Sequence, residues 1–251
     1  LLAMCMAEPY GPEASEKYAA DPESMAFNCY FRGGVDRFVM DGHTISGLSI
    51  TGSGNVRGLF RYIQPSGVVR DLSVEGRVDP SDRKNTLGGI AGSNSGRIYG
   101  CMHAASGNRV LYTGGGFAGG IAGCNEVGGK LENVTMNGSV TAANGEAGGV
   151  TAHNYGSITM SRVYGSSDAI GGITACNEAG AVISDANLFN MASFGGDVRL
   201  YGPATRVGGL VGYNAGEVTN SKVDAGSLSL ANLTAGDSTV TAGGALGENT
   251  G

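Results

Sequence analysis

The sequence predicts an all-β fold, a right-handed parallel β-solenoid (β-helix) with an N-terminal cap. The main observation is a seven-residue motif that occurs six times, always with an asparagine five positions after its second glycine. Such self-similarity is typical of repeat architectures, and parallel connections wind right-handed. The shortest interval, from Gly148 to Gly171, is 23 residues, which suits two or three short strands and leaves no room for a crossover helix. The copies are GGIAGSN from Gly88, GGIAGCN from Gly119, GGVTAHN from Gly148, GGITACN from Gly171, GGLVGYN from Gly208 and GGALGEN from Gly243.

The chain divides into two predicted parts. Residues 1–40 contain helix formers, acidic residues and several aromatic residues, and we expect them to form an N-terminal cap, because an open first coil would expose the core and a strand edge. Short alternating apolar runs begin at Asp41, so residues 41–251 are predicted to form the solenoid. Residues 58–63 look like a divergent copy of the motif. The last copy stops before its following strand, so we expect the solenoid to continue beyond residue 251.

Stacked coils place equivalent motif positions above one another, about 4.8 Å apart. The glycine pair then either adopts positive φ or lies where the backbone is too crowded for a Cβ. The third motif residue forms a buried apolar stack, and a strand follows each asparagine, with Ile98, Leu131, Ile158, Val182 or Ile183, and Val218 in the equivalent place. The motif asparagines form a structural ladder in which each amide bonds its neighbours. They are Asn94, Asn125, Asn154, Asn177, Asn214 and Asn249.

The repeated pattern resembles the GLUG repeat of bacterial surface proteins. The closest copy is GGLVGYNAGEVTNS from Gly208, and the upstream segments DGHTISGLSI and GLFRYI are similar to the lead-in that precedes such repeats. The similarity covers about residues 41–251. It implies an exported bacterial protein, located outside the cell or on the bacterial surface. It further implies β-solenoid segments like those of adhesin-like proteins and of the non-catalytic part of IgA-protease-like metallopeptidases.

Several functional classes are excluded by composition and motifs. A net charge of −6 with scattered Lys and Arg argues against nucleic-acid partners. No apolar run reaches the ~18 residues of a membrane span. The histidines are His43, His103 and His153, so the chain has no HExxH zinc-protease motif, and it has no CxxC pair. We therefore expect no enzymatic activity, no catalytic residue, no metal and no cofactor.

One constellation of chemically active side chains surrounds the middle asparagines. Stacking would place His153 between two thiols and Tyr155 between two carboxylates. Two sharp hypotheses are a Cys₂His metal site and an acid pair two coils apart, about 9.6 Å, near the range of inverting glycosidases. Because a linear column supplies convergent metal ligands poorly, a surface arrangement without chemistry is the preferred interpretation. The residues are Cys124, Glu126, His153, Tyr155, Cys176 and Glu178.

The expected function is a non-catalytic repeat scaffold, outside the cell, that mediates adhesion or acts as a rigid stalk. Its partner would be a protein or glycan on a host or neighbouring cell, bound through one solenoid face or through inserted loops. Three insertions are candidates for such loops, at residues 104–118, 187–206 and 224–242. The alternatives are an accessory repeat region of a large secreted IgA-protease-like metallopeptidase and a polysaccharide-active β-helix, which the scattered carboxylates disfavour.

Overall fold

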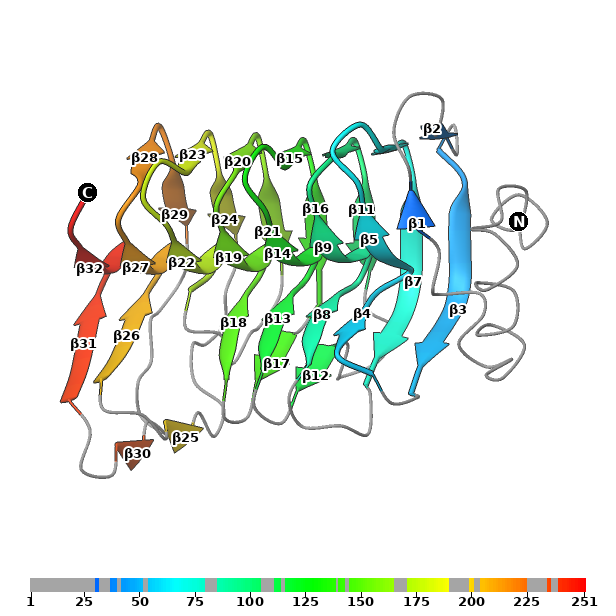
Figure 1. The fold of residues 1–251 in the computed structure, drawn as a ribbon. Coiled ribbons are helices and arrows are strands. Elements are labelled where there is room, and N and C mark those ends of the chain that lie inside the picture. Colours follow the sequence, from blue (N-terminus) through cyan, green and yellow to red (C-terminus); the bar gives the residue numbers. More distant parts are fainter. Residues whose placement is uncertain are drawn as a thin grey trace.

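The chain folds into a parallel β-solenoid whose successive coils stack along one axis (Figure 1), as the sequence predicts. A computed structural model describes residues 30–31, 37–39, 42–51, 54–79, 85–104, 111–113, 116–138, 140–142, 145–164, 171–189, 199–200, 204–224, 234–235 and 239–251. Within these ranges the regular elements are all strands, and no helix is present that could cross a membrane. The right-handed sense of winding stays a prediction from strand twist.

Sheet A contains the second half of every motif copy and crosses the front of the molecule in Figure 1. Its eight strands pair in parallel, one from each successive coil. They are β1 (Tyr30–Phe31), β5 (Phe60–Ile63), β9 (Ala91–Asn94), β14 (Ala122–Asn125), β19 (Thr151–Asn154), β22 (Thr174–Asn177), β27 (Val211–Asn214) and β32 (Leu246–Asn249). In this register Ile63 pairs with Asn94, so residues 58–63 are the divergent copy and Ile63 occupies the asparagine position.

Sheet B follows the motif asparagine in each coil. Its strands are β2 (Arg37–Val39), β6 (Val68–Arg70), β10 (Arg97–Tyr99), β15 (Lys130–Glu132), β20 (Ser157–Thr159), β23 (Val182–Ser184) and β28 (Glu217–Thr219). The apolar stack predicted for these strands is present, and the register places Ile183, not Val182, opposite Ile158 and Val218. Ile183 is buried because it points inward.

Sheet C closes the far side of each coil. Its strands are β3 (Thr44–Ile50), β7 (Ser73–Val78), β11 (Met102–Ala104), β12 (Leu111–Thr113), β16 (Thr135–Asn137), β17 (Val140–Ala142), β21 (Arg162–Tyr164), β24 (Asn187–Phe189) and β29 (Lys222–Asp224). β3 bends at Gly47, which has φ 75°, and its register with β7 shifts between Ile45 and Leu48.

Sheet D leads into the glycine pair of the next coil. Its strands are β4 (Val56–Arg57), β8 (Thr86–Gly88), β13 (Phe117–Gly119), β18 (Glu146–Gly148), β26 (Ala204–Gly208) and β31 (Thr239–Gly243). Single parallel bridges at Gly171 connect β18 to β26. The three insertions predicted as loops lie largely outside the described residues, and their described parts include β12 and the paired strands β25 (Arg199–Leu200) and β30 (Thr234–Ala235).

The predicted cap at residues 1–40 also lies largely outside the described residues. Its described parts, β1 and β2, pair with β5 and β6, so sheets A and B extend into this segment. The division of the chain at residue 40 therefore stays a prediction.

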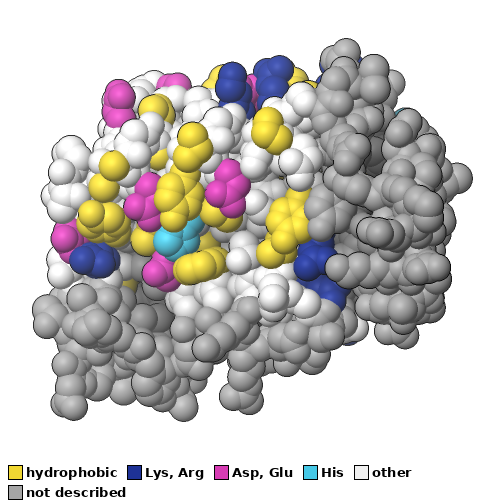
Figure 2. All heavy atoms as spheres, viewed as in Figure 1, with side chains coloured by type: hydrophobic (Ala, Val, Ile, Leu, Met, Phe, Trp, Pro, Cys, Tyr) yellow, Lys and Arg dark blue, Asp and Glu magenta, His cyan; other side chains and the backbone are white. Residues whose placement is uncertain are grey.

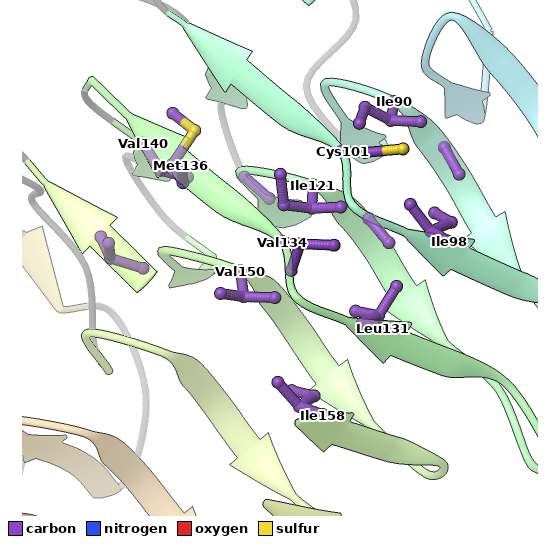
Figure 3. Packing of buried hydrophobic residues seen from close by; sticks show 14 of the residues in the cluster. Ile90, Ile98, Cys101, Ile121, Leu131, Val134, Met136, Val140, Val150 and Ile158 are labelled. Carbon is purple, nitrogen blue, oxygen red and sulfur yellow. The ribbon is translucent and has the colours of Figure 1, made fainter. Parts of the chain in front are cut away.

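The core is a set of apolar columns that run along the solenoid axis (Figure 3). Ile90, Ile121 and Val150 form one column, and the backbone N–H of each donates to the carbonyl of its successor in the next coil. Ile98, Leu131 and Ile158 form a second column from sheet B. Every coil therefore buries its apolar side chains against those of its neighbours, which is the main source of solenoid stability.

The glycine pair is required for close approach and not for positive φ, since its glycines are absent from the residues with positive φ. A Cβ on Gly149 would overlap the Gly172 carbonyl oxygen and lie 2.9 Å from Val163 Cγ1. Gly89 is the equivalent glycine two coils earlier, and a Cβ there would overlap the ring of His103. Of the two explanations that the sequence left open, crowding is the one that holds.

The asparagines form a continuous internal column. Each Nδ2 donates to the Oδ1 of the asparagine in the next coil, at 2.8 Å from Asn94 to Asn125, from Asn125 to Asn154 and from Asn154 to Asn177. The column continues at 2.7 Å to Asn214 and at 2.6 Å to Asn249. The amides also donate to carbonyls of the adjacent turn, as from Asn125 to Gly129 at 3.2 Å. Because the first five are buried, the ladder satisfies polar groups that water cannot reach.

Candidate functional site

The candidate site lies on the outer face where sheets A and D meet. Outward residues of sheet A form a column in register, in which His153 is flanked by Cys124 and Cys176. Figure 2 shows hydrophobic, acidic and histidine side chains gathered on this face. The sheet A register thus places a histidine between two thiols, and a second column beside it carries Glu126, Tyr155 and Glu178, whose N–H groups bond consecutive motif asparagines.

His153 is the centre of the site. Its Nε2 lies 2.6 Å from Glu146 Oε2, its Nδ1 lies 3.2 Å from Glu178 Oε1, and 15% of its side chain is exposed. Burial opposes the charged imidazole, but the two carboxylates outweigh burial and raise the pKa of His153 above its ordinary value. The ring also meets Phe117 edge-on at 4.5 Å between centroids. His153 is therefore held on both nitrogens and on one face.

Glu146 links the histidine to a thiol. Cys176 donates a hydrogen bond from Sγ to Glu146 Oε2 at 3.2 Å. Burial and the Glu146 carboxylate raise the pKa of the Cys176 thiol, so the sulfur is protonated in the metal-free chain. For Glu146, burial opposes ionisation, but the His153 and Cys176 contacts outweigh it and lower the pKa of this carboxyl. The arrangement is therefore a carboxylate that forms an ion pair with an imidazole and accepts a hydrogen bond from a thiol.

The other predicted residues of the constellation lie around this centre without joining it. Glu126 accepts a hydrogen bond from Ser93 Oγ at 2.8 Å, in the preceding coil. Burial, followed by Glu126, raises the pKa of Cys124. Tyr155 is exposed, and its ring lies 6.0 Å from that of His153 between centroids. The two carboxylates proposed as an acid pair thus have separate partners, Ser93 for Glu126 and His153 for Glu178.

Glu146 is the residue that sequence reasoning missed. It lies on β18, two residues before its glycine pair, and Phe117 and Thr86 occupy the same place in the preceding coils. Its side chain reaches the sheet A column across the bend that the glycine pair makes. Glu146, His153 and Cys176 each offer a ligand atom, and these atoms lie within 4.8 Å of one another. In the described part of the chain, this set replaces the Cys₂His set considered from sequence, because it excludes Cys124.

Two coils further on, the same two columns hold a different polar group. Arg206 lies two residues before its glycine pair and forms an ion pair with Glu248. Its guanidinium also lies 4.8 Å from the centroid of the Tyr213 ring. The outward positions therefore vary from coil to coil, whereas the inward positions repeat.

A family model for the GLUG motif matches residues 203–229. The chain carries the GLUG repeat. The matched segment contains Asn214 of the ladder and the strands β27 and β28, and the other copies occupy the same positions of sheet A in neighbouring coils. The GLUG motif thus supplies the internal bonds of this solenoid, and the site around His153 is formed from positions that the motif leaves free. No curated protein and no solved structure matches the chain.

Proposed function

We propose that this chain is a non-catalytic extracellular scaffold that holds a binding face on a rigid stalk. The single observation that carries the proposal is that inward and outward residues of the GLUG coil have different roles. The inward residues of the motif pack in the core or form the asparagine ladder, while the residues at its outward positions differ between coils. Recognition groups on rigid scaffolds commonly occupy such variable outward positions.

The face formed by sheets A and D has the chemistry of a recognition surface. Phe117 and Tyr155 are exposed large aromatic side chains next to His153, and acidic groups lie among them (Figure 2). On the sheet C side, Tyr164 stacks on Phe189 with ring centroids 5.3 Å apart. Aromatic rings offer large contact area at low entropic cost, so they support a protein or glycan partner on another cell.

The proposal is tested by binding and by location. The purified chain is screened against host glycans and extracellular-matrix proteins, beside a Phe117→Ala/Tyr155→Ala double variant. Val127→Ala is the matched control, because Val127 is an exposed apolar residue on the turn between β14 and β15. We expect the double variant to lose at least about tenfold in affinity, equivalent to ~1.4 kcal/mol, and the control to keep wild-type binding.

Location is measured by protease digestion of intact bacteria, with and without lysis. A surface scaffold is cleaved before lysis. Cleavage only after lysis would contradict the extracellular part of the proposal, and partner binding unchanged in the double variant would contradict the assignment of the face. The accessory role in a secreted metallopeptidase stays a prediction.

A further inference from the structure

We propose that Glu146, His153 and Cys176 bind one Zn²⁺ ion on the outer face of the solenoid. The three residues come from β18, β19 and β22, so they converge from two sheets and two successive coils. A linear column alone supplies convergent metal ligands poorly, but here Glu146 approaches the column from the neighbouring sheet D. The site lies on the same face as Phe117 and Tyr155, but the zinc assignment does not depend on which partner that face binds.

The donor atoms match the preferences of zinc. A thiolate sulfur, an imidazole nitrogen and a carboxylate oxygen are its usual protein ligands, at about 2.0–2.3 Å. The three atoms already lie within 4.8 Å of one another, with 2.6 Å between His153 Nε2 and Glu146 Oε2 and 3.2 Å between Cys176 Sγ and the same oxygen. Tetrahedral coordination needs about 3.3 Å between the nitrogen and the oxygen. A small outward rotation of Glu146 therefore opens the centre for the ion.

Glu178 supplies the outer contact that zinc-bound histidines need. A metal-bound imidazole usually donates its other N–H to a carboxylate, which fixes its tautomer and orientation. Glu178 Oε1 lies 3.2 Å from His153 Nδ1, on the side of the ring away from Glu146. Glu178 is therefore a positioning residue that directs the Nε2 lone pair toward the ion.

The charge and exposure of the site also favour a dication. Glu146 and Glu178 give the site two negative charges against the one positive charge of nearby Arg206. All three proposed ligands are half-buried, so the fourth position of the ion can hold water. Binding displaces the Cys176 thiol proton and, where present, the imidazolium proton of His153, and both go to solvent. The ion would join three strands, which stabilises the middle of the stack.

The first test is Zn²⁺ binding by the whole metal-free chain, kept with a non-thiol reductant and measured by competition with a chromophoric chelator. We expect one Zn²⁺ per chain and a loss of at least about tenfold in affinity for Cys176→Ala and for the isosteric Glu146→Gln. Cys124→Ala is the matched control, because Cys124 is the half-buried thiol on the other side of His153. It should bind as the wild type does. Circular dichroism establishes that each variant is folded.

The second test uses Co²⁺ as a spectroscopic probe. We expect a thiolate-to-cobalt charge-transfer band that Cys124→Ala keeps and Cys176→Ala loses. Glu178→Gln should keep the band while its affinity falls about 10- to 100-fold, as expected for an outer carboxylate. No stoichiometric Zn²⁺ binding, binding unchanged in Cys176→Ala and Glu146→Gln, or a loss in Cys124→Ala as large as that in Cys176→Ala would overturn the assignment.

Discussion

At the scale of single residues, His103 is the least expected member of the core. It is fully buried in sheet C, in register with Val74 before it and Met136 after it. Its Nδ1 donates to the Gly120 carbonyl oxygen at 2.9 Å, and Gly89 leaves room for the ring. A polar, titratable side chain thus occupies a position that is apolar in the neighbouring coils.

Burial lowers the pKa of His103 below its ordinary value of 6.5. In the unfolded chain His103 takes up a proton near pH 6.5, whereas in the folded chain it stays neutral at that pH. The free energy of unfolding therefore falls as the pH drops below that value. His153 acts in the opposite sense, because its raised pKa adds stability below pH 6.5 that is lost as the pH rises through its folded value.

We predict that His103→Met reduces the acid sensitivity of the fold. Methionine should fit the position of His103, because Met136 occupies the equivalent position one coil later, packed against Gly120. Urea unfolding is measured for wild type and variant between about pH 8 and about pH 5, where one proton changes the free energy by at most ~1.4 kcal/mol per pH unit. The wild type should lose stability relative to the variant at the acid end. A constant difference across this range would show that His103 is not the responsible group.

For individual residues of the candidate site, the sequence predicted some contacts and missed others. The motif spacing identified the asparagine column and the neighbours of His153, because parallel stacking transfers register directly from sequence. It did not identify Glu146, because its contact with His153 depends on the angle between sheets D and A, which periodicity does not encode. The choice between Val182 and Ile183 needed the structure for a similar reason, since both are apolar.

At the scale of the coil, the glycine pair determines how closely sheets D and A can approach their neighbours. In the first five pairs the second glycine lies against the sheet C side chain of its own coil, as Gly120 does against Met136 and Gly172 against Leu188. The sequence left both positive φ and crowding open for these glycines, and only the structure separates the two explanations. Positive φ occurs instead at the turn between sheets B and C, where Asn133 and Met160 adopt it at 48° and 51°.

Gly149→Ala should therefore be strongly destabilising. Its Cβ would overlap the Gly172 carbonyl oxygen and crowd Val163, so the coil must shift against both neighbours, at a cost of about 2 kcal/mol or more. Gly244 is the matched control, because it has the same motif position in the last copy and a Cβ there meets nothing within 4 Å. Gly244→Ala should change the free energy of unfolding by less than about 0.5 kcal/mol. Equal effects in thermal melts would contradict the crowding argument.

At the scale of the whole molecule, stacking gives the inward motif residues of the described coils structural partners in the neighbouring coils. The core columns and the asparagine ladder run through consecutive coils, so each coil is stabilised mainly by its neighbours. The sequence could predict this architecture because its spacing repeats. The partner of the molecule could not be predicted in this way, because recognition depends on outward residues that do not repeat.

The GLUG asparagine is an internal structural element of the solenoid, and urea unfolding of Asn154→Ala beside Asn249→Ala tests this claim. Asn154→Ala removes the acceptor of Asn125 and the donor to Asn177, both buried, so we expect a loss of about 3 kcal/mol. In the chain of residues 1–251, Asn249 is exposed and accepts from Asn214 alone in the ladder, so its variant in this chain should lose less than about 1 kcal/mol. Similar losses in the two variants, or an Asn154→Ala variant as stable as the wild type, would contradict the claim.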